Sequence, residues 1–114
     1  MKPDLSVWLG RRVRVLVDRP LGTTHPHHPD LLYTLDSGEL PGTLSGNLLP
    51  IDAYLLGWSA PVAEAVVTVI AVIVRADDMK DKLAVARDGS IWSDLQILSA
   101  VHFQEQYFQV RLLR

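Results

Sequence analysis

The feature that most constrains this fold is an uncharged run at residues 65–74 in which nearly every side chain is branched at Cβ. Valine, isoleucine and threonine favour extended strands because their side chains pack well on a pleated, half-buried surface. We therefore predict one long strand over residues 65–76. A long central strand of this kind bends in β-barrels, and Ala71 is the expected position of the bend.

Shorter strands are predicted on both sides of this one. Val13, Val15 and Val17 lie on one face, which is the alternation of a half-buried strand. The shorter predicted strands are residues 12–18, 31–35, 50–56, 82–86 and 109–114, of which 82–86 is expected to pair with the long strand. Segments rich in proline or glycine are predicted to lie between strands, as a loop at residues 23–30 and mostly turn at residues 36–49.

The periodicity changes near the C-terminus from that of strands to that of a helix. Ser93 is the expected N-cap, with Gln96 three residues later as its capping-box partner. Leu95, Leu98 and Val101 follow at helical spacing and are expected to pack on the sheet. Five or six strands with one C-terminal helix predict a mainly β, α+β fold built as a small barrel.

Length and composition limit the class of protein. A chain of 114 residues can build one hydrophobic core, so a single domain over residues 1–114 is predicted. The net charge of −2 indicates no general affinity for nucleic acid or membranes. The absence of cysteine excludes thiol catalysis and cysteine-ligated metal sites. Because the N-terminus lacks the apolar core of a signal peptide, we expect a cytoplasmic protein.

A histidine cluster lies in the predicted loop at residues 23–30. His25, His27 and His28, with Asp30 beyond them, have spacings that could chelate a transition metal. Two prolines stiffen this loop, and no second ligand pair recurs elsewhere in the sequence. Solvated histidines are therefore the favoured interpretation, with a metal site as the alternative.

A highly charged turn follows the long strand. Asp77, Asp78 and Asp81 bring three carboxylates close to Lys80 and Lys82. Carboxylates beside an ammonium group, at the end of a buried strand, can hold a divalent cation against a phosphate. The alternative is a polar turn that ends the strand.

Asp52 lies inside an otherwise apolar predicted strand. A charge in that position is costly unless it is paired, binds an ion or faces solvent. It either faces solvent or acts as a metal ligand that meets the carboxylates of the charged turn. The basic residues Arg19, Arg75 and Lys82 could hold a phosphate beside such a cation. They could equally form ordinary surface ion pairs.

Taken in order along the chain, these segments resemble the soluble (family I) inorganic pyrophosphatases. The likeness covers roughly residues 12–110. It is carried by the segments at residues 15–20 (VLVDRP), 41–46 (PGTLSG), 50–57 (PIDAYLLG), 69–83 and 103–107 (FQEQY). The resemblance implies a five-stranded closed barrel of oligonucleotide-binding (OB) topology with a helix packed on it. It also implies Mg²⁺ as cofactor and pyrophosphate, or a related phosphoanhydride, as substrate.

The resemblance also implies roles for particular residues. Asp52 and Asp81 would be the catalytic carboxylates. Metal would be held by Asp52, Asp77, Asp78 and Asp81, and phosphate by Arg19, Lys82 and Tyr107. Trp58 and Trp92 could serve a homo-oligomeric interface or pack against the barrel.

The sequence departs from the family pattern in the catalytic signature. Asn47 and Leu49 stand where the first two signature aspartates are expected, so that only Asp52 remains. A second function is therefore a degenerate homologue that binds phosphate, metal or a partner without turnover. If a cation site is retained, we expect Asp52 and Asp81 to converge on a cavity that also holds Arg19 and Lys82.

Overall fold

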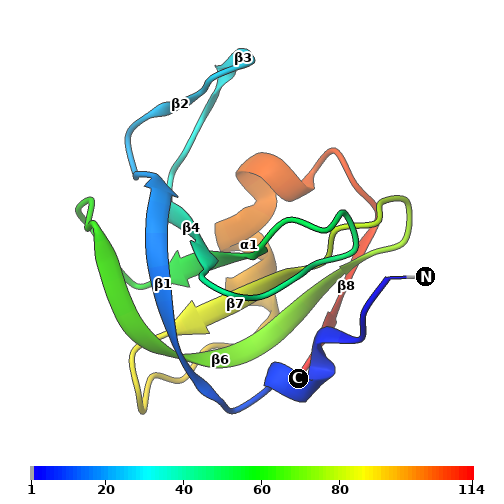
Figure 1. The fold of residues 1–114 in the computed structure, drawn as a ribbon. Helices are drawn as coiled ribbons and strands as arrows, with labels where there is room; N and C mark the ends of the chain where they lie inside the picture. Colours follow the sequence, from blue (N-terminus) through cyan, green and yellow to red (C-terminus); the bar gives the residue numbers. More distant parts are fainter. Residues whose placement is uncertain (1) are drawn as a thin grey trace.

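The protein is described here by a computed structural model that covers residues 2–114. Its elements in chain order are η1 (Leu5–Trp8), β1 (Arg12–Arg19), β2 (Thr24–His25), β3 (His28–Leu32), β4 (Asp36–Leu40), β5 (Ile51–Leu56), β6 (Glu64–Arg75), β7 (Lys82–Ala86), α1 (Asp94–Glu105) and β8 (Val110–Leu113). Figure 1 shows β6 as a long curved strand below β7, with α1 behind the strands.

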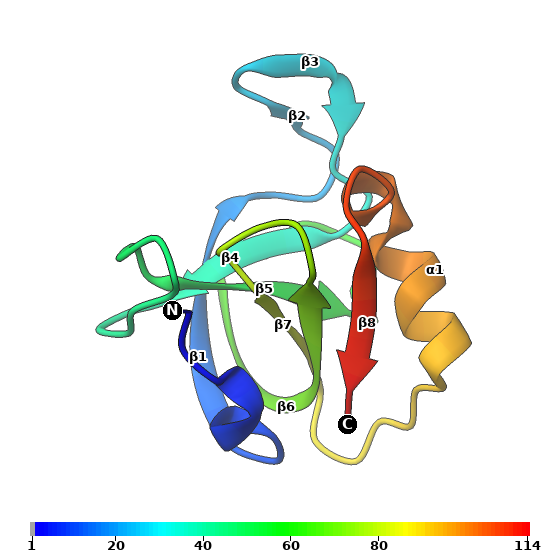
Figure 2. The ribbon, with the colours of Figure 1, turned by 90° about the vertical axis from the view of Figure 1, so that its right-hand side faces the viewer.

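Five strands close into a mixed barrel. They pair in the order β1-β4-β5-β7-β6, and a further β1–β6 pairing closes the ring. β5 and β7 run parallel, whereas the other pairs are antiparallel. β8 extends the sheet from β6 outside the ring, and β2 and β3 form a separate hairpin (Figure 2). The expected fold, a mainly β OB-like barrel with one C-terminal helix, is confirmed.

The long strand β6 makes the closure possible because different parts of it pair with different partners. Its first half pairs with β1 and its second half with β8, while β7 pairs along its middle. The register with β7 slips between Val69 and Ala71, which leaves Ile70 as an extra residue. A bulge of this kind bends a strand and increases its twist. The bend therefore lies one residue before the predicted position at Ala71.

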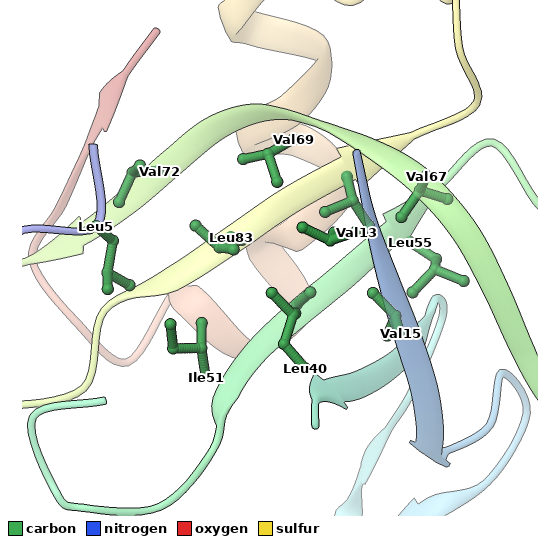
Figure 3. Close-up of a cluster of buried hydrophobic side chains, with 12 residues drawn as sticks. Leu5, Val13, Val15, Leu40, Ile51, Leu55, Val67, Val69, Val72 and Leu83 are labelled. Carbon is green, nitrogen blue, oxygen red and sulfur yellow. The ribbon is translucent and has the colours of Figure 1, made fainter. Parts of the chain in front are cut away.

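The buried side chains form two layers because neighbouring residues of a strand point to opposite faces. Figure 3 shows the layer inside the barrel, to which Val15, Leu55 and Leu83 contribute. The second layer lies between the outer face of the barrel and α1, and contains Tyr54 and Ile97. β5 is therefore buried on both faces for most of its length, and only Asp52 remains half-buried.

Two segments predicted to lie outside strands contain strands. Residues 36–49 begin with β4, and residues 23–30 contain β2 and the start of β3. The glycines misled the first prediction. At Gly38 a Cβ would lie 2.2 Å from the carbonyl oxygen of Leu16 and 2.8 Å from Val15 Cγ1. Gly38 is thus required by the close approach of β1 to β4, rather than by a turn.

The helix begins as predicted, and Val101 is buried as expected, but the rest of the buried face differs from the prediction. Ser93 Oγ accepts from the Gln96 backbone at 3.1 Å, and Gln96 Oε1 accepts from the Ser93 backbone at 2.8 Å. The buried face is Ile97, Val101 and Glu105, whereas Leu95 is 77% exposed. This face includes Glu105 because its carboxylate meets a buried arginine from the barrel.

Trp58 and Trp92 are partly buried, each packed against one of the two apolar layers. Within residues 2–114, no helix is both long enough and apolar enough to cross a membrane.

Candidate functional site

A cavity of about 290 Å³ opens on the outer face of the barrel, beside the end of α1. Its walls are rich in charge and come from β1, β4, β5 and the start of β7. The charged residues that line it are Asp18, Arg19, Glu39, Asp52, Lys80 and Lys82. Tyr33, Ser37, Gln104 and His25 add polar or aromatic groups, and Leu49 and Pro50 form an apolar part of the wall. Three cations here face three carboxylates.

The sheet register brings these residues together. Asp52 is the Cα partner of Glu39 on β4 and of Lys82 on β7, so the three side chains form one row across three strands. Arg19 pairs with Ser37, two residues along β4 from Glu39. Because directly opposed residues point to the same face, this row projects from the outer face of the barrel.

Asp52 is neutralised by ammonium groups. Its Oδ2 lies 2.9 Å from Lys80 Nζ and 3.8 Å from Lys82 Nζ. The side chain is 22% exposed and faces the cavity. The charge of Asp52 on this otherwise apolar strand is thus paired within the site, and the groups beside its carboxylate are the ammonium groups of two lysines.

Lys82 is the most deeply buried cation of the cavity. Its Nζ lies 3.3 Å from Gln104 Oε1 and 3.5 Å from the Tyr54 hydroxyl. Burial, opposed in part by the charge of Asp52, lowers the pKa of Lys82 to about 8. The amine is therefore mostly protonated at neutral pH. Its contacts are long, so it retains hydrogen-bonding capacity for a ligand.

Arg19 offers a second cation. Its Nη1 donates to the backbone oxygen of Asp18 at 3.1 Å. Among residues 2–114 it has no carboxylate partner within 4.0 Å. Burial raises the pKa of Asp18, opposed by the charge of Arg19 and assisted by that of Asp52. The guanidinium is therefore available to an anion, and protonation of Asp18 would reduce the opposing charge.

The carboxylates of the charged turn lie outside this cavity. Asp81 Oδ1 accepts from Lys2 Nζ at 2.7 Å and from the Arg75 backbone at 3.0 Å. Asp78 Oδ2 accepts from Arg75 Nη1 at 2.8 Å. Asp77 Oδ1 accepts a backbone hydrogen bond at 3.0 Å from the residue before β8. Each carboxylate is thus used to hold the turn together.

The Lys2 ammonium group donates hydrogen bonds to three oxygens at the same turn. Besides Asp81, it donates to the backbone oxygens of Arg75 at 2.6 Å and Asp78 at 3.2 Å. The N-terminal segment therefore supplies the cation that this group of oxygens binds.

A buried ionic network beneath the cavity is not evident from sequence motifs. Arg75 is 4% exposed and forms a two-pronged pair with Glu105, through Nε to Oε1 at 2.8 Å and through Nη2 to Oε2. The Tyr54 hydroxyl donates to Glu105 Oε2 at 2.6 Å. One sequence signal was available: Glu105 continues the spacing of Ile97 and Val101, where a charge requires a buried partner.

The two positions that depart from the family signature have local roles. Asn47 Oδ1 accepts from Ser45 Oγ at 2.6 Å and from the Leu49 backbone at 3.2 Å. Its amide oxygen therefore stabilises the turn before β5. Leu49 lies at the rim of the cavity and is 55% exposed.

The donor atoms present do not fit a magnesium ion. Mg²⁺ requires near-octahedral oxygen ligands, usually including one or two carboxylates. Within residues 2–114, no group of three or more His, Asp or Glu side chains is arranged to hold a metal. In the cavity, Asp52 is paired with ammonium groups. The structure therefore brings together Arg19, Asp52 and Lys82 of the predicted site, but separates them from the turn carboxylates.

Tyr107 lies in a neighbouring cavity, away from Arg19 and Lys82. His25, His27 and His28 line the same neighbouring cavity. His25 Nδ1 accepts from the His27 backbone at 3.0 Å, which uses one of its two ring nitrogens.

Solved structures of bacterial inorganic pyrophosphatases share this architecture. The enzyme from Ehrlichia chaffeensis has a TM-score of 0.66 and 17% identity, over 90% of this chain and 85% of that one. The Neisseria gonorrhoeae enzyme gives 0.62 and 17%, over 91% and 81%. That from Thermus thermophilus gives 0.59 and 17%, over 98% and 84%. No protein-family model matches the sequence, and no curated protein matches it. These likenesses establish the fold alone.

Proposed function

We propose that this chain binds the phosphate group of an anionic ligand in the cavity of Arg19 and Lys82, without metal-dependent turnover. The observation that carries the proposal is the pairing of Asp52 with Lys80 and Lys82. Ammonium groups stand beside the carboxylate that the family resemblance assigns to a metal. The cavity thus contains its own cations.

The geometry of the cations supports phosphate as the ligand. Arg19 presents a planar fork of donors, which matches the tetrahedral oxygens of phosphate. The Lys82 ammonium group is largely buried, so its attraction to an anion is only weakly screened by solvent. Charge-assisted hydrogen bonds of this kind are roughly twice as strong as neutral ones.

Turnover is disfavoured because the carboxylates are already engaged. For Asp81 to reach a metal, it would have to leave Lys2 and the Arg75 backbone. Leaving Asp81, whose side chain is 7% exposed, without these partners costs about 1–2 kcal/mol, because a polar group is left unsatisfied. Asp78 would also have to leave Arg75.

A second candidate is Mg²⁺-dependent hydrolysis of pyrophosphate. It is favoured by the pyrophosphatase fold and by the presence of Asp18 and Glu39 in the cavity. In that case Asp52 and Asp81 would be the catalytic carboxylates and Mg²⁺ the cofactor. Asp77 and Asp78 would complete the metal ligands, and Tyr107 would bind phosphate.

Binding of inorganic phosphate, measured by calorimetry, tests the first proposal. Lys82→Met and Arg19→Met are each expected to weaken binding by about tenfold to a hundredfold, since each removes a hydrogen bond to a charged group. The matched control is Arg111→Met, an exposed arginine on β8. Equal affinity in the wild type and both cavity variants, or no binding at all, would overturn the proposal.

Release of phosphate from pyrophosphate, with and without Mg²⁺, separates the two candidates. We expect no Mg²⁺-dependent release above that of Asp81→Ala. A Mg²⁺-dependent rate in the wild type that disappears in Asp81→Ala would instead establish the hydrolase.

A further inference from the structure

A second cavity of about 530 Å³ adjoins the cavity of Arg19 and Lys82, which we call the cationic cavity after these two residues. One wall comes from the β2–β3 hairpin, through His25, His27 and His28. The opposite wall comes from the C-terminal end of α1 and the residues after it, through Tyr107 and Phe108. Figure 2 shows this hairpin standing away from the barrel, above the turn that joins α1 to β8. The volume lies within the range of about 300–1,000 Å³ that is typical of small-molecule sites.

The two cavities share part of their walls. His25 and Gln104 line both of them. A ligand with its phosphate between Arg19 and Lys82 could therefore extend past His25 into the second cavity. This continuity makes the second cavity the natural place for the remainder of a phosphate-containing ligand.

Planar rings dominate the walls of the second cavity. The His25 ring lies 4.8 Å from that of His28 and 5.9 Å from that of His27, centroid to centroid. The His25 ring also lies 6.4 Å from the ring of Tyr33, which lines the cationic cavity, and is nearly parallel to it. Tyr107 is 68% exposed although it is a large ring. Exposed rings around a concavity suit a planar ligand group that stacks on them.

Charge argues against a second phosphate in this cavity. None of the described residues that line it is a lysine or an arginine, and Asp30 adds a carboxylate. Burial, together with repulsion from His28 and Arg19, lowers the pKa of His25. The imidazole nearest to the cationic cavity is therefore neutral at pH 7. The second phosphoryl group of pyrophosphate would find little positive charge here.

We infer that the two cavities together bind a phosphate monoester that carries a planar ring, of the nucleoside monophosphate class. The phosphate lies against Arg19 and Lys82, and the ring lies between the histidine hairpin and Tyr107. This inference rests on the proposed phosphate binding and names the ligand class of the same site. It also gives the histidine cluster a role as a stacking wall.

Three probes separate the parts of such a ligand. Adenosine monophosphate contains both parts, ribose 5-phosphate lacks the ring, and adenosine lacks the phosphate. Calorimetry is expected to show adenosine monophosphate binding about tenfold more tightly than ribose 5-phosphate, since stacking of one base on aromatic side chains has about this effect. Adenosine is expected to bind more weakly than the monophosphate by at least a similar factor.

Variants of the aromatic wall locate the ring. Tyr107→Ala is expected to weaken adenosine monophosphate about tenfold and to leave ribose 5-phosphate unchanged, whereas Tyr107→Phe retains the affinity for both. Phe108→Leu provides a second variant, which is expected to weaken adenosine monophosphate and to leave ribose 5-phosphate unchanged. Leucine replaces phenylalanine here because it keeps an apolar side chain against Arg75, whose guanidinium carbon lies 3.7 Å from the centroid of the Phe108 ring. Leu95→Ala, at an exposed leucine of α1, is the matched control.

The outcomes distinguish this inference from the function on which it rests. Equal affinities for adenosine monophosphate and ribose 5-phosphate would overturn the ring site while phosphate binding stands. Weakened inorganic phosphate binding in Tyr107→Phe would make the hydroxyl a phosphate ligand and would also overturn the stacking role. Failure of inorganic phosphate itself to bind would overturn the proposed function first.

Discussion

The charged turn and the cationic cavity are built from the same residue types, but they use their charges differently. In the turn, Asp81 and Asp78 are held by Lys2 and Arg75, so the ionic groups stabilise the chain itself. In the cavity, Lys82 is buried with only long contacts, so its charge remains available to a ligand. Charge density in a sequence therefore does not distinguish a binding site from a structural ion cluster. What distinguishes them is how close the existing contacts are: 2.7–3.0 Å for Asp81 and Asp78 in the turn, and 3.3–3.8 Å for Lys82 in the cavity.

The difference depends on which way successive side chains point. Lys80 and Lys82 both line the cavity, because residues two apart in an extended chain share a face. Asp81, between them, points away from the cavity to Lys2. A shift of one residue in this segment would exchange the roles of the lysines and the aspartate.

The largest expected effect comes from breaking the network that underlies both regions. Arg75→Ala leaves Glu105 buried without its cation and is expected to lower the free energy of unfolding by about 3–5 kcal/mol. Urea denaturation measures this loss. Arg111→Ala, an exposed arginine on the adjacent strand β8, should change stability by no more than about 0.5 kcal/mol. Similar stabilities for the two variants would show that Glu105 reaches solvent.

A smaller effect should separate the turn from the cavity. Lys2→Met removes the ammonium group bound to Asp81 and to two backbone oxygens. We expect a loss of about 1–2 kcal/mol in unfolding free energy, because polar groups are left unsatisfied. Phosphate affinity should stay within about twofold of the wild type, since the cavity is formed by other residues. Loss of phosphate binding without loss of stability would contradict the separation of the two regions.

The smallest expected effect is a pH dependence confined to the cavity. With a pKa of about 8, Lys82 is mostly neutral at pH 9, and phosphate affinity should fall about tenfold between pH 7 and pH 9. Tyr54 beside it stays neutral over this range, because burial, and then the charge of Glu105, raises its pKa well above the usual value. The other charged groups that act on Lys82 are Asp52, Arg75, Glu105 and Lys80. Lys82→Met should remove this fall and leave only the dependence that comes from ionisation of the phosphate itself. An undiminished fall in that variant would assign it elsewhere.

Stability should respond to the same group in the opposite direction. The pKa of Lys82 is lower in the folded chain than its ordinary value of 10.5. Between about pH 8 and 10.5, the unfolded chain therefore binds more protons at Lys82 than the folded chain does. The contribution of Lys82 to the free energy of unfolding consequently rises with pH over this range. Comparing the wild type with Lys82→Met over this range isolates the contribution.

Much of the fold could be predicted from the sequence because its signals are local. The β-branched run of β6, the alternation of Val13 and Val15, and the capping box at Ser93 each depend on residues that are neighbours in the chain. The strand at Asp36–Leu40 could not be predicted in this way. Its Gly38 is explained by the approach of β1, which is distant in sequence.

The candidate site, like the fold, could be predicted from the sequence only in part. The sequence by itself determined that Arg19, Asp52 and Lys82 were candidate site residues, because a charge at the end of or within an apolar strand requires a partner or a ligand. Only the tertiary structure decided which partners these residues have. The sheet register places Asp52 between Glu39 and Lys82, and the folding of the N-terminus brings Lys2 to Asp81. The physical reason is that register and side-chain direction are fixed by pairing between distant strands, whereas strand and helix propensity is fixed by neighbouring residues.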